Sequence, residues 1–474
     1  MVKPLWTAQD IIAATGGTAR CASGHELGDV TGISIDSRTV EPGDLFIAIA
    51  GDRFDGHDFV DAALDAGASA ALVSADQADR YAVRQGGLII VPDSYKGLYD
   101  LARVARARTN AKIIAVTGSV GKTSTKETLR LVLSQFGVTH APVKSFNNHW
   151  GVPLTLCRMP RDAEFGVFEI GMNHSDEITP LSQLVRPDVA MITTVAPVHL
   201  ENLGSLDAIA AAKAEVFDGL TPGGTAVIHG DIEHAPFLKD HATRAGAGQV
   251  MTFGHGAGST AELMQVVLLA DCSSVDAKIA GEQLTYKVGA PGEHLVINSL
   301  GVLAVCSSLG LDLARCGLAL AGMEQPDGRG RRHTLVTPGD PITLLDESYN
   351  ANPTSVRAAL KVLARLPLGS RGKRIAVLGD MLELGDDAAD MHADLAEDLQ
   401  IQGVDRLFAC GPMMKALWRA TPMERRGHYA ETSDGLQSAL CADLAPGDAV
   451  MIKGSLGSRM GPLVDLLLQR YQER

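Results

Sequence analysis

The sequence predicts an α/β protein with three domains, each built around a mainly parallel β-sheet. Short apolar runs alternate with helical patterns along the chain, and this order is typical of parallel sheets covered by helices. The 474 residues are too many for one hydrophobic core, because domains usually hold about 100–200 residues. Aromatic residues make up only 4% of the chain, which suits closely packed α/β layers better than an aromatic binding surface.

We expect a small α/β domain over residues 1–108. Its strands are predicted at four short apolar runs separated by glycine turns, and a helix at 57–68 ends on glycine, as helices often do. A second helix, at 94–109, leads into the next domain. The four strand runs are GISIDSR, GDLFIAI, ASAALVS and GLIIVPD.

The central domain is predicted over residues 109–330. It opens with the strand run KIIAVTG, and further buried strands are expected at 165–171, 189–195 and 224–230. Residues 250–290 look instead like short antiparallel strands. We expect a hinge near 325–333, where EQPDGRG interrupts the pattern.

A Rossmann-like domain is expected over residues 331–474. Its strand runs are ITLLDES, RIAVLGD, RLFACG and DAVMIKG, with helical patterns between them. In doubly wound sheets of this kind, ligands bind at the carboxyl ends of the strands.

The net charge of −14 argues against a nucleic-acid partner, which would need a basic face, but not against small anionic substrates. Seven scattered cysteines without a C-x-x-C pair favour a reducing compartment. No apolar stretch is long enough for a signal peptide or a membrane span. We therefore expect a cytoplasmic protein without membrane insertion, acting as a monomer.

Residues 115–125, AVTGSVGKTST, nearly match the phosphate-loop pattern G-x-x-x-x-G-K-[ST]. The first glycine is missing, because Val116 stands five residues before Gly121. Glycines, a lysine and a hydroxyl are still present between a strand and a helix, where backbone N–H groups and the helix N-terminus bind phosphate. A simple glycine turn with Lys122 in solvent is the alternative. The strand–loop–helix context favours a nucleotide site with a shortened loop.

Three further residues stand where side chains of their type are unusual. Glu169 ends an apolar strand, where a carboxylate is costly unless it is paired or bound to metal; a frayed strand end is the alternative. His199 follows another strand, although a lone histidine is usually structural. Lys213 shares the apolar face of the helix at 206–220, so it either snorkels to a rim or is desolvated and partly neutral. A neutral amine can react with CO₂ to form a carbamate.

The run ITLLDESYNANPTSV starts the third domain. Asp346 ends its strand, and Asn352 with Pro353 has the character of a helix N-cap followed by the first helical residue. Capping explains Asn352 but not Asp346, Tyr349 and Asn350. These polar groups lie on a strand-to-helix loop, where such sheets bind ligands.

Taken together, these stretches resemble the Mur ligase family over nearly the whole chain. TGSVGKTS is that family's shortened phosphate loop, and SIDSRTVEPGDLFIAIAGDRFDGHDFV is similar to its substrate-anchoring first domain. NNHWGVPLTL, EIGMNHSDEI, SYNANP, VLGDMLELG and KGSLGSRM resemble the dipeptide-adding members in particular. The DNPR run of the diaminopimelate-adding members is missing.

The resemblance implies ATP and two Mg²⁺ ions as cofactors. Lys122, His199 and Lys213 are the implied catalytic residues. Thr123 and Glu169 would hold one Mg²⁺, and His199 with a carbamylated Lys213 a second. The ATP phosphates would be wrapped by Gly118, Ser119, Val120, Gly121, Lys122, Thr123 and Ser124, with Lys122 on the β and γ oxygens.

The remaining implied contacts spread over all three domains. Asn298 would contact adenine, while Asp346 and an arginine, Arg329 or Arg331, would reach the ribose and phosphates. The implied substrates are UDP-N-acetylmuramoyl-tripeptide and D-Ala-D-Ala. Ser37 and Arg38 would lie against the UDP, Asn148 near the muramoyl group, and Tyr349, Asn350 and Asn352 near the dipeptide.

These substrates imply an ATP-dependent ligase that forms a peptide bond through an acyl phosphate in peptidoglycan precursor synthesis. Another Mur-type ligase, adding the third residue or polyglutamylating folate, would share the loop and Lys213. A small-molecule kinase or an ATP-binding regulator would share the loop alone.

Overall fold

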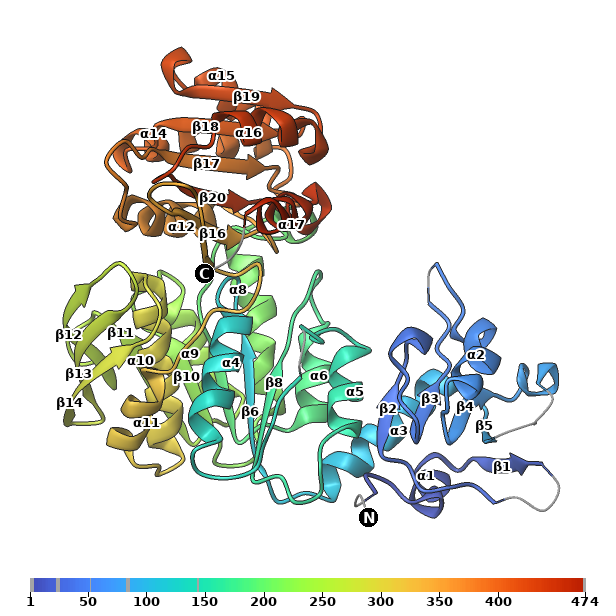
Figure 1. The fold of residues 1–474 in the computed structure, drawn as a ribbon. Helices are drawn as coiled ribbons and strands as arrows, with labels where there is room; N and C mark the ends of the chain where they lie inside the picture. Colours follow the sequence, from blue (N-terminus) through green and yellow to red (C-terminus); the bar gives the residue numbers. More distant parts are fainter. Residues whose placement is uncertain (1–3, 23–25, 52, 82–85, 143–144, 472–474) are drawn as a thin grey trace.

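The computed structural model describes residues 4–22, 26–51, 53–81, 86–142 and 145–471. They form three β-sheets, of five, nine and six strands, in chain order. Figure 1 shows the N-terminal and C-terminal domains at different ends of the central one. The predicted α/β fold is confirmed.

The N-terminal sheet has the strand order β1-β5-β4-β3-β2, parallel except for β1 against β5. Helix α3 leads from this sheet into the central one. The elements are α1 (Ala8–Thr15), β1 (Thr18–Cys21), β2 (Gly32–Ser34), β3 (Asp44–Ile47), α2 (Val60–Asp65), β4 (Ala70–Ser74), β5 (Gly87–Val91) and α3 (Ser94–Ala107).

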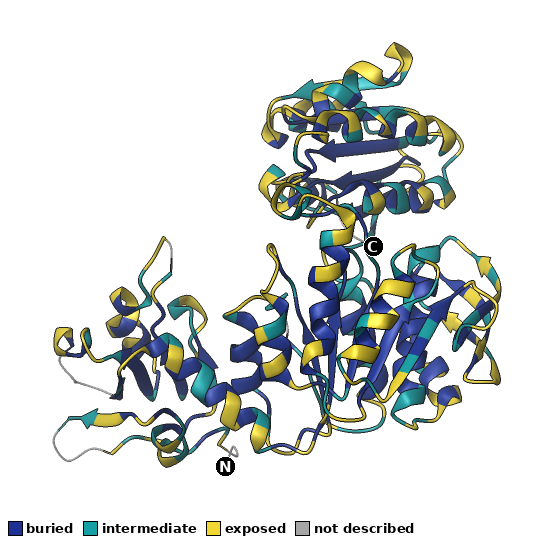
Figure 2. Cartoon of the chain, turned by 180° about the vertical axis from the view of Figure 1, so that it is seen from behind, coloured by how far each residue is buried: buried dark blue, intermediate teal, exposed yellow. Residues whose placement is uncertain are grey.

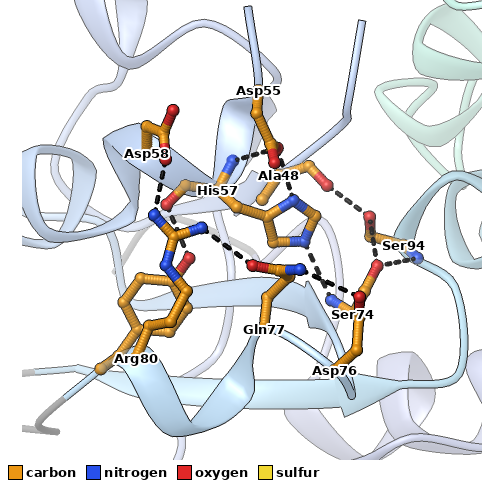
Figure 3. Close-up of polar contacts among 10 residues, drawn as sticks. Ala48, Asp55, His57, Asp58, Ser74, Asp76, Gln77, Arg80 and Ser94 are labelled. Atoms are coloured by element: carbon orange, nitrogen blue, oxygen red, sulfur yellow. Dashed lines mark hydrogen bonds and ion pairs between the residues drawn. The ribbon is translucent and has the colours of Figure 1, made fainter.

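A buried histidine joins the loops of this domain to its sheet (Figure 3). His57 is 3% exposed; its Nδ1 lies 2.7 Å from Asp55 Oδ1, and its Nε2 accepts the N–H of Ser74 at 3.1 Å. Ser74 Oγ in turn accepts the N–H of Ser94 at 3.0 Å, at the start of α3. Because Nε2 accepts, Nδ1 carries the proton. The ring therefore acts as a neutral, structural bridge between loop and strand.

The central sheet has the order β14-β13-β12-β11-β10-β9-β6-β8-β7. Its parallel half carries the phosphate loop. The strands are β6 (Lys112–Thr117), β7 (Thr139–His140), β8 (Phe165–Glu169), β9 (Val189–Ile192), β10 (Thr225–His229), β11 (Gln249–Gly254), β12 (Ala261–Leu268), β13 (Ser273–Ile279) and β14 (Glu282–Val288).

Helices cover both faces of this sheet. Those used below are α4 (Lys122–Leu133), α5 (Gly151–Cys157), α6 (Ile178–Val185), α8 (Leu206–Ala214), α9 (Ala235–Arg244), α10 (Glu293–Ser308) and α11 (Leu313–Leu320). Alternate residues of β6 enter two separate cores: Ile113 and Ala115 one, Ile114 and Val116 the other. The apolar run is therefore a strand buried on both faces.

The prediction for residues 250–290 was partly wrong. β11 pairs in parallel with β10, and β12 begins in parallel with β11, so the parallel sheet extends further than expected. Only β12, β13 and β14 form an antiparallel meander. The run MTFGHG is compatible with an edge hairpin and with a buried parallel strand. In the structure α10 packs over it, and it forms a buried parallel strand.

The C-terminal sheet has the order β15-β16-β20-β17-β18-β19, parallel except for the pair β15–β16. Helix α12 (Pro353–Arg365) follows the loop after β16. The strands are β15 (Arg331–Leu335), β16 (Ile342–Glu347), β17 (Arg374–Gly379), β18 (Arg406–Cys410), β19 (Arg426–Ala430) and β20 (Ala449–Lys453).

The hydrophobic core of the C-terminal domain is separate from the core that the other two domains share. Figure 2 shows the buried residues of each domain. One continuous hydrophobic cluster includes Ile47 and Leu98 of the N-terminal domain and Ile113 of the central sheet. The C-terminal domain instead has clusters of its own on the two faces of its sheet. None of the helices formed by the described residues combines the length and apolar character needed to cross a bilayer.

We predict that His57→Leu loosens strand β4. The leucine leaves the Ser74 N–H without an acceptor, which costs about 1–3 kcal/mol for a buried donor. Hydrogen exchange of β4 amides should become roughly 5- to 150-fold faster. Asp58→Asn is the matched control, because Asp58 pairs with Arg80 at the surface. Equal exchange in His57→Leu and the control would contradict the bridging role.

Candidate active site

The candidate site lies where the parallel strands β6, β8 and β9 end. The loop after β6 runs from Gly118 to Gly121, and α4 begins at Lys122. The first N–H groups of a helix have no intrahelical acceptor, and they carry the positive end of the helix dipole. The end of β6 thus presents a helix N-terminus, as the sequence predicted, and such a terminus can bind an anion.

The two glycines of the loop are required by its geometry. Gly118 has a φ of 145°, and a Cβ there would stand 1.9 Å from Thr193 Oγ1 on the neighbouring strand's extension. Gly121 has a φ of 86°, and a Cβ there would stand 2.6 Å from Asn298 Nδ2 of α10. A side chain at either position would therefore force the loop away from its neighbours.

The strand explains why the first glycine of the pattern is absent. Val116 is still within β6 and fully buried, so the turn starts only at Gly118. The short loop is tied to the end of β9: Thr193 Oγ1 donates to Val120 O at 2.6 Å, and Ser119 Oγ donates to Ala196 O at 3.0 Å. The loop is thus pre-formed by bonds that involve side chains rather than by a further glycine.

A cluster of oxygens stands beside the loop. Glu169 is 1% exposed at the end of β8, and its Oε2 accepts Thr123 Oγ1 at 2.9 Å. Its Oε1 accepts Asn147 Nδ2 at 2.7 Å. Ser145 Oγ lies 3.1 Å from Thr123 Oγ1. A carboxylate and a hydroxyl in contact are the oxygen donors that Mg²⁺ prefers, so the residues predicted for the first metal fit it.

Lys122 folds back over its own loop. Its Nζ donates to Gly118 O at 2.5 Å. Burial lowers the pKa of Lys122, while the Glu169 carboxylate raises it and Arg329 lowers it further. The Lys122 side chain therefore lies against its own loop, with the Arg329 guanidinium close enough to affect it.

Lys213 is buried, and no carboxylate of the described residues pairs with it. It is 2% exposed near the end of α8, and the polar neighbour recorded for its Nζ among the described residues is Met172 Sδ, at 4.0 Å. Burial, followed by the charge of Lys122, sets the pKa of Lys213 well below its ordinary value. Of the two sequence interpretations, the side chain does not snorkel; it is a desolvated amine.

His199 joins the central domain to the C-terminal one. Its Nδ1 contacts Glu383 Oε2, and the bond from His199 is the main cause that keeps the pKa of Glu383 below its ordinary value. Both residues have left-handed backbones, with φ of 55° and 63°. Non-glycine residues are held this way at a cost, and such strain gathers at functional sites.

The loop after β16 brings the third domain into the site. Asn352 caps α12 through a capping box with Ser355, and Pro353 is the first helical residue, as predicted. Lys453, 2% exposed, donates to Asn350 O at 2.9 Å and pairs with Glu347 at 3.1 Å. This buried ion pair fixes the loop that carries the predicted dipeptide contacts.

A cavity of about 770 Å³ collects most of the predicted residues. The central and C-terminal domains both line it. It includes Ser119, Val120, Gly121, Lys122, Thr123, Ser124, Glu169, His199, Asn298, Arg329, Tyr349, Asn350 and Asn352.

Arg329 rather than Arg331 faces this cavity. Its guanidinium lies 4.0 Å from the centre of the Tyr349 ring, and Nη2 donates to Ser145 Oγ at 3.2 Å. Arg331 pairs with Asp327 at the surface. Asp346 does not line the cavity: its Oδ2 accepts the Gly328 N–H at 2.8 Å and its Oδ1 accepts Ser348, so it shapes the turn that holds Arg329.

The predicted sugar-nucleotide residues lie elsewhere. Asn148 lines a second cavity, of about 780 Å³, which shares Asn147, Met172 and Asn173 with the first. Ser37 and Arg38 line neither cavity. They form a short helical turn of the N-terminal domain, where Arg38 Nη2 lies 2.7 Å from Asp36 Oδ2. Their contact with UDP stays a prediction.

Sequence reasoning missed several residues that the structure places here. Asn147 and Lys453 are polar groups in runs already quoted, NNHWGVPLTL and KGSLGSRM, and Ser145 stands two residues before the first of these runs. Glu383 stands in VLGDMLELG. Polar residues close to the start of a helix were the available signal, but the partners come from distant parts of the chain.

Known proteins show the same organisation. Residues 29–106 match the description "Mur ligase family, catalytic domain", 116–306 "Mur ligase middle domain", and 331–456 "Mur ligase, glutamate ligase domain". A UDP-N-acetylmuramoyl-tripeptide–D-alanyl-D-alanine ligase of Bacillus subtilis is 32% identical, over 94% of each chain. This chain belongs to the Mur ligase family.

Solved structures agree with this membership. MurF from Acinetobacter baumannii superposes on this Mur ligase with a TM-score of 0.84 at 29% identity, covering 98% of this chain and 99% of that one. MurF from Thermotoga maritima, in complex with ADP, gives a TM-score of 0.76 at 26% identity, covering 93% and 98%.

We predict that Lys213→Met stabilises this Mur ligase while removing its activity. At pH 7 the unfolded chain holds Lys213 charged, whereas the fold favours the neutral amine; each tenfold preference costs about 1.4 kcal/mol. The thermal midpoint should rise by at least roughly 2–4 °C in CO₂-free buffer.

The pH dependence gives the check. Between the low folded pKa and about 10.4 the unfolded state binds more protons, so the parent's stability rises with pH and its difference from Lys213→Met shrinks. Lys239→Met, on the exposed side of α9, should change neither quantity. A midpoint that falls in Lys213→Met at every pH would refute this prediction.

Proposed function

We propose that this Mur ligase joins D-Ala-D-Ala to UDP-N-acetylmuramoyl-tripeptide, with cleavage of ATP to ADP and phosphate. One observation carries the proposal: the phosphate loop and the SYNANP loop, from different domains, line the same cavity. A kinase needs a phosphate loop, but not a second domain that presents amide and phenol groups opposite it. The names of the relatives support the choice of substrates.

The reaction needs an activated acyl group. The terminal carboxylate of the tripeptide attacks the γ-phosphorus of ATP, the bond to the β-phosphate oxygen breaks, and ADP leaves. The dipeptide amine then attacks the acyl carbon, phosphate leaves, and the nitrogen loses a proton. Phosphoryl charge develops on oxygens during the first step, so catalysis depends on fixed positive groups and on position.

Residues of this chain have defined tasks in that scheme. Lys122 and the N-terminus of α4 bind the phosphates, and Arg329, held by Ser145, adds positive charge from the domain linker. Thr123 and Glu169 would hold Mg²⁺, which neutralises charge on the phosphate oxygens when bound. Asn298 bounds the nucleotide end of the cavity. Ser37, Arg38 and Asn148 would bind the sugar nucleotide beyond it.

Lys213 would serve as a carbamate. Its neutral amine attacks CO₂, a C–N bond forms, and one proton is released. The buried side chain, which could otherwise carry a positive charge, then carries a negative one. The observed burial without a carboxylate partner suits this exchange of charge. The carbamate and His199 would then hold or position a second Mg²⁺. For His199 to do so through Nδ1, Glu383 must give up its contact.

We predict phosphate release only with the matching amine. With UDP-tripeptide and ATP present, D-Ala-D-Ala should give coupled ADP and phosphate, whereas diaminopimelate, lysine and glutamate should not. Lys122→Ala should lower kcat at least about 100-fold, because it removes charge from the transition state. Release with glutamate or diaminopimelate would identify another Mur-type ligase, and ADP formation without phosphate would identify a kinase.

We predict that short carboxylic acids rescue Lys213→Ala. The truncated side chain leaves space in which acetate or formate can replace the carbamate, so activity should return with the added acid. Lys122→Ala, which lacks a phosphate contact instead, should not respond. The measurement is phosphate release against acid concentration at constant ionic strength. Equal responses of both variants, or none in Lys213→Ala, would count against the carbamate.

A further inference from the structure

The loop between β7 and α5 carries two groups of the oxygen cluster. Asn147 donates to Glu169 Oε1 at 2.7 Å, and Ser145 Oγ lies 3.1 Å from Thr123 Oγ1 and accepts from Arg329 at 3.2 Å. This loop has no regular secondary structure over its described residues 145–147. One backbone bond, from Gly171 N–H after β8 to Asn147 O at 2.8 Å, ties it to the sheet, and side-chain contacts add to this in holding it beside the phosphate loop.

One such contact is made by Lys126. This residue lies on α4, one turn after Lys122, and its side chain is fully buried. Its Nζ donates to Pro142 O at 2.7 Å, on the same loop, and to Glu127 Oε1 at 2.5 Å. The ammonium thus ties the helix that begins at the phosphate loop to the loop that carries Ser145 and Asn147.

The need to neutralise Glu127 does not by itself explain why a lysine is buried at position 126. Arg130 Nε already lies 2.7 Å from Glu127 Oε2, from the exposed side of the same helix. A buried cation costs more to desolvate than an apolar side chain of similar volume, so charge pairing is a weak reason to place one here. What an apolar residue cannot supply is the bond to the Pro142 carbonyl.

We propose that Lys126 is a positioning residue for the ligase reaction. Through Pro142 it holds Ser145 and Asn147 against Thr123 and Glu169, so that both faces of the oxygen cluster keep their places relative to α4. The inference rests on the proposed function for its effect on rate, but the anchoring itself does not. Displacement of such groups by about 1 Å is enough to cost about 100-fold in rate.

The test compares Lys126→Met with Arg130→Met. Lys126→Met keeps the apolar stem and removes the donor to Pro142, whereas Arg130→Met removes only the outer cation from Glu127. Lys126→Met should lower kcat about 10- to 100-fold while KM for D-Ala-D-Ala stays within twofold. Amide hydrogen exchange at 145–150 should rise at least about tenfold. Arg130→Met should leave the rate and the exchange unchanged.

A double-mutant cycle separates positioning from general stability. Asn147→Ala removes the bond to Glu169, so adding Lys126→Met to it should cost far less than Lys126→Met alone. A purely structural lysine would lower the thermal midpoint of both backgrounds equally and leave kcat per folded molecule unchanged, which would overturn the proposal. If Lys126→Met does not fold, Lys126→Gln keeps a shorter donor and is tested in the same way.

The two proposals fail differently. A parent enzyme that releases no phosphate with D-Ala-D-Ala contradicts the proposed function, while loop exchange still tests the anchor. An active parent with unchanged exchange at 145–150 in Lys126→Met contradicts the anchor alone.

Discussion

The active site depends on one buried carboxylate. Glu169 ends β8 inside the molecule, and each of its oxygens accepts a hydrogen bond from a different segment: Thr123 from α4 and Asn147 from the loop before α5. A carboxyl group at 1% exposure is tolerated only with such partners. The two hydrogen bonds to Glu169 therefore fix the phosphate loop, the edge of the sheet and the loop between β7 and α5 relative to one another. A bound cation would replace bonds that the protein has already arranged.

Two buried lysines of the central domain show how surroundings decide chemistry. Lys126 has a carbonyl and a carboxylate within 2.7 Å, so its charge is matched and its position is fixed. Lys213 has a thioether at 4.0 Å and a neighbouring cation, so burial favours its neutral form. These surroundings suit the roles that we propose, the first lysine as an anchor for a loop and the second as a nucleophile toward CO₂. Residue type and burial alone do not distinguish them.

Sequence reasoning reached features that repeat locally. The apolar period over 206–220 placed Lys213 on the buried face of a helix without deciding between snorkelling and desolvation. Strand–loop–helix order predicted a helix start at the phosphate loop, and capping chemistry predicted the role of Asn352. The sequence could not predict contacts between residues that only the folded topology brings together. Lys126 beside Glu127 resembles any charged helix face, and only the fold places the Pro142 carbonyl over it. The direction of β11 likewise depends on packing by α10 rather than on its own residues.

The separate core of the C-terminal domain has a mechanistic consequence. Its hydrophobic clusters do not merge with those of the central domain, so polar contacts such as His199–Glu383 and the stacking of Arg329 on the Tyr349 ring connect the two. Polar interfaces of this kind permit relative domain motion at low cost. Joining an acid to an amine requires the reacting atoms to approach within about 3–3.5 Å, although the loops that would hold them belong to different domains. Domain closure would therefore change the partners of the residues that now bridge the domains. His199 is the clearest case, because its proposed metal role and its bond to Glu383 use the same ring.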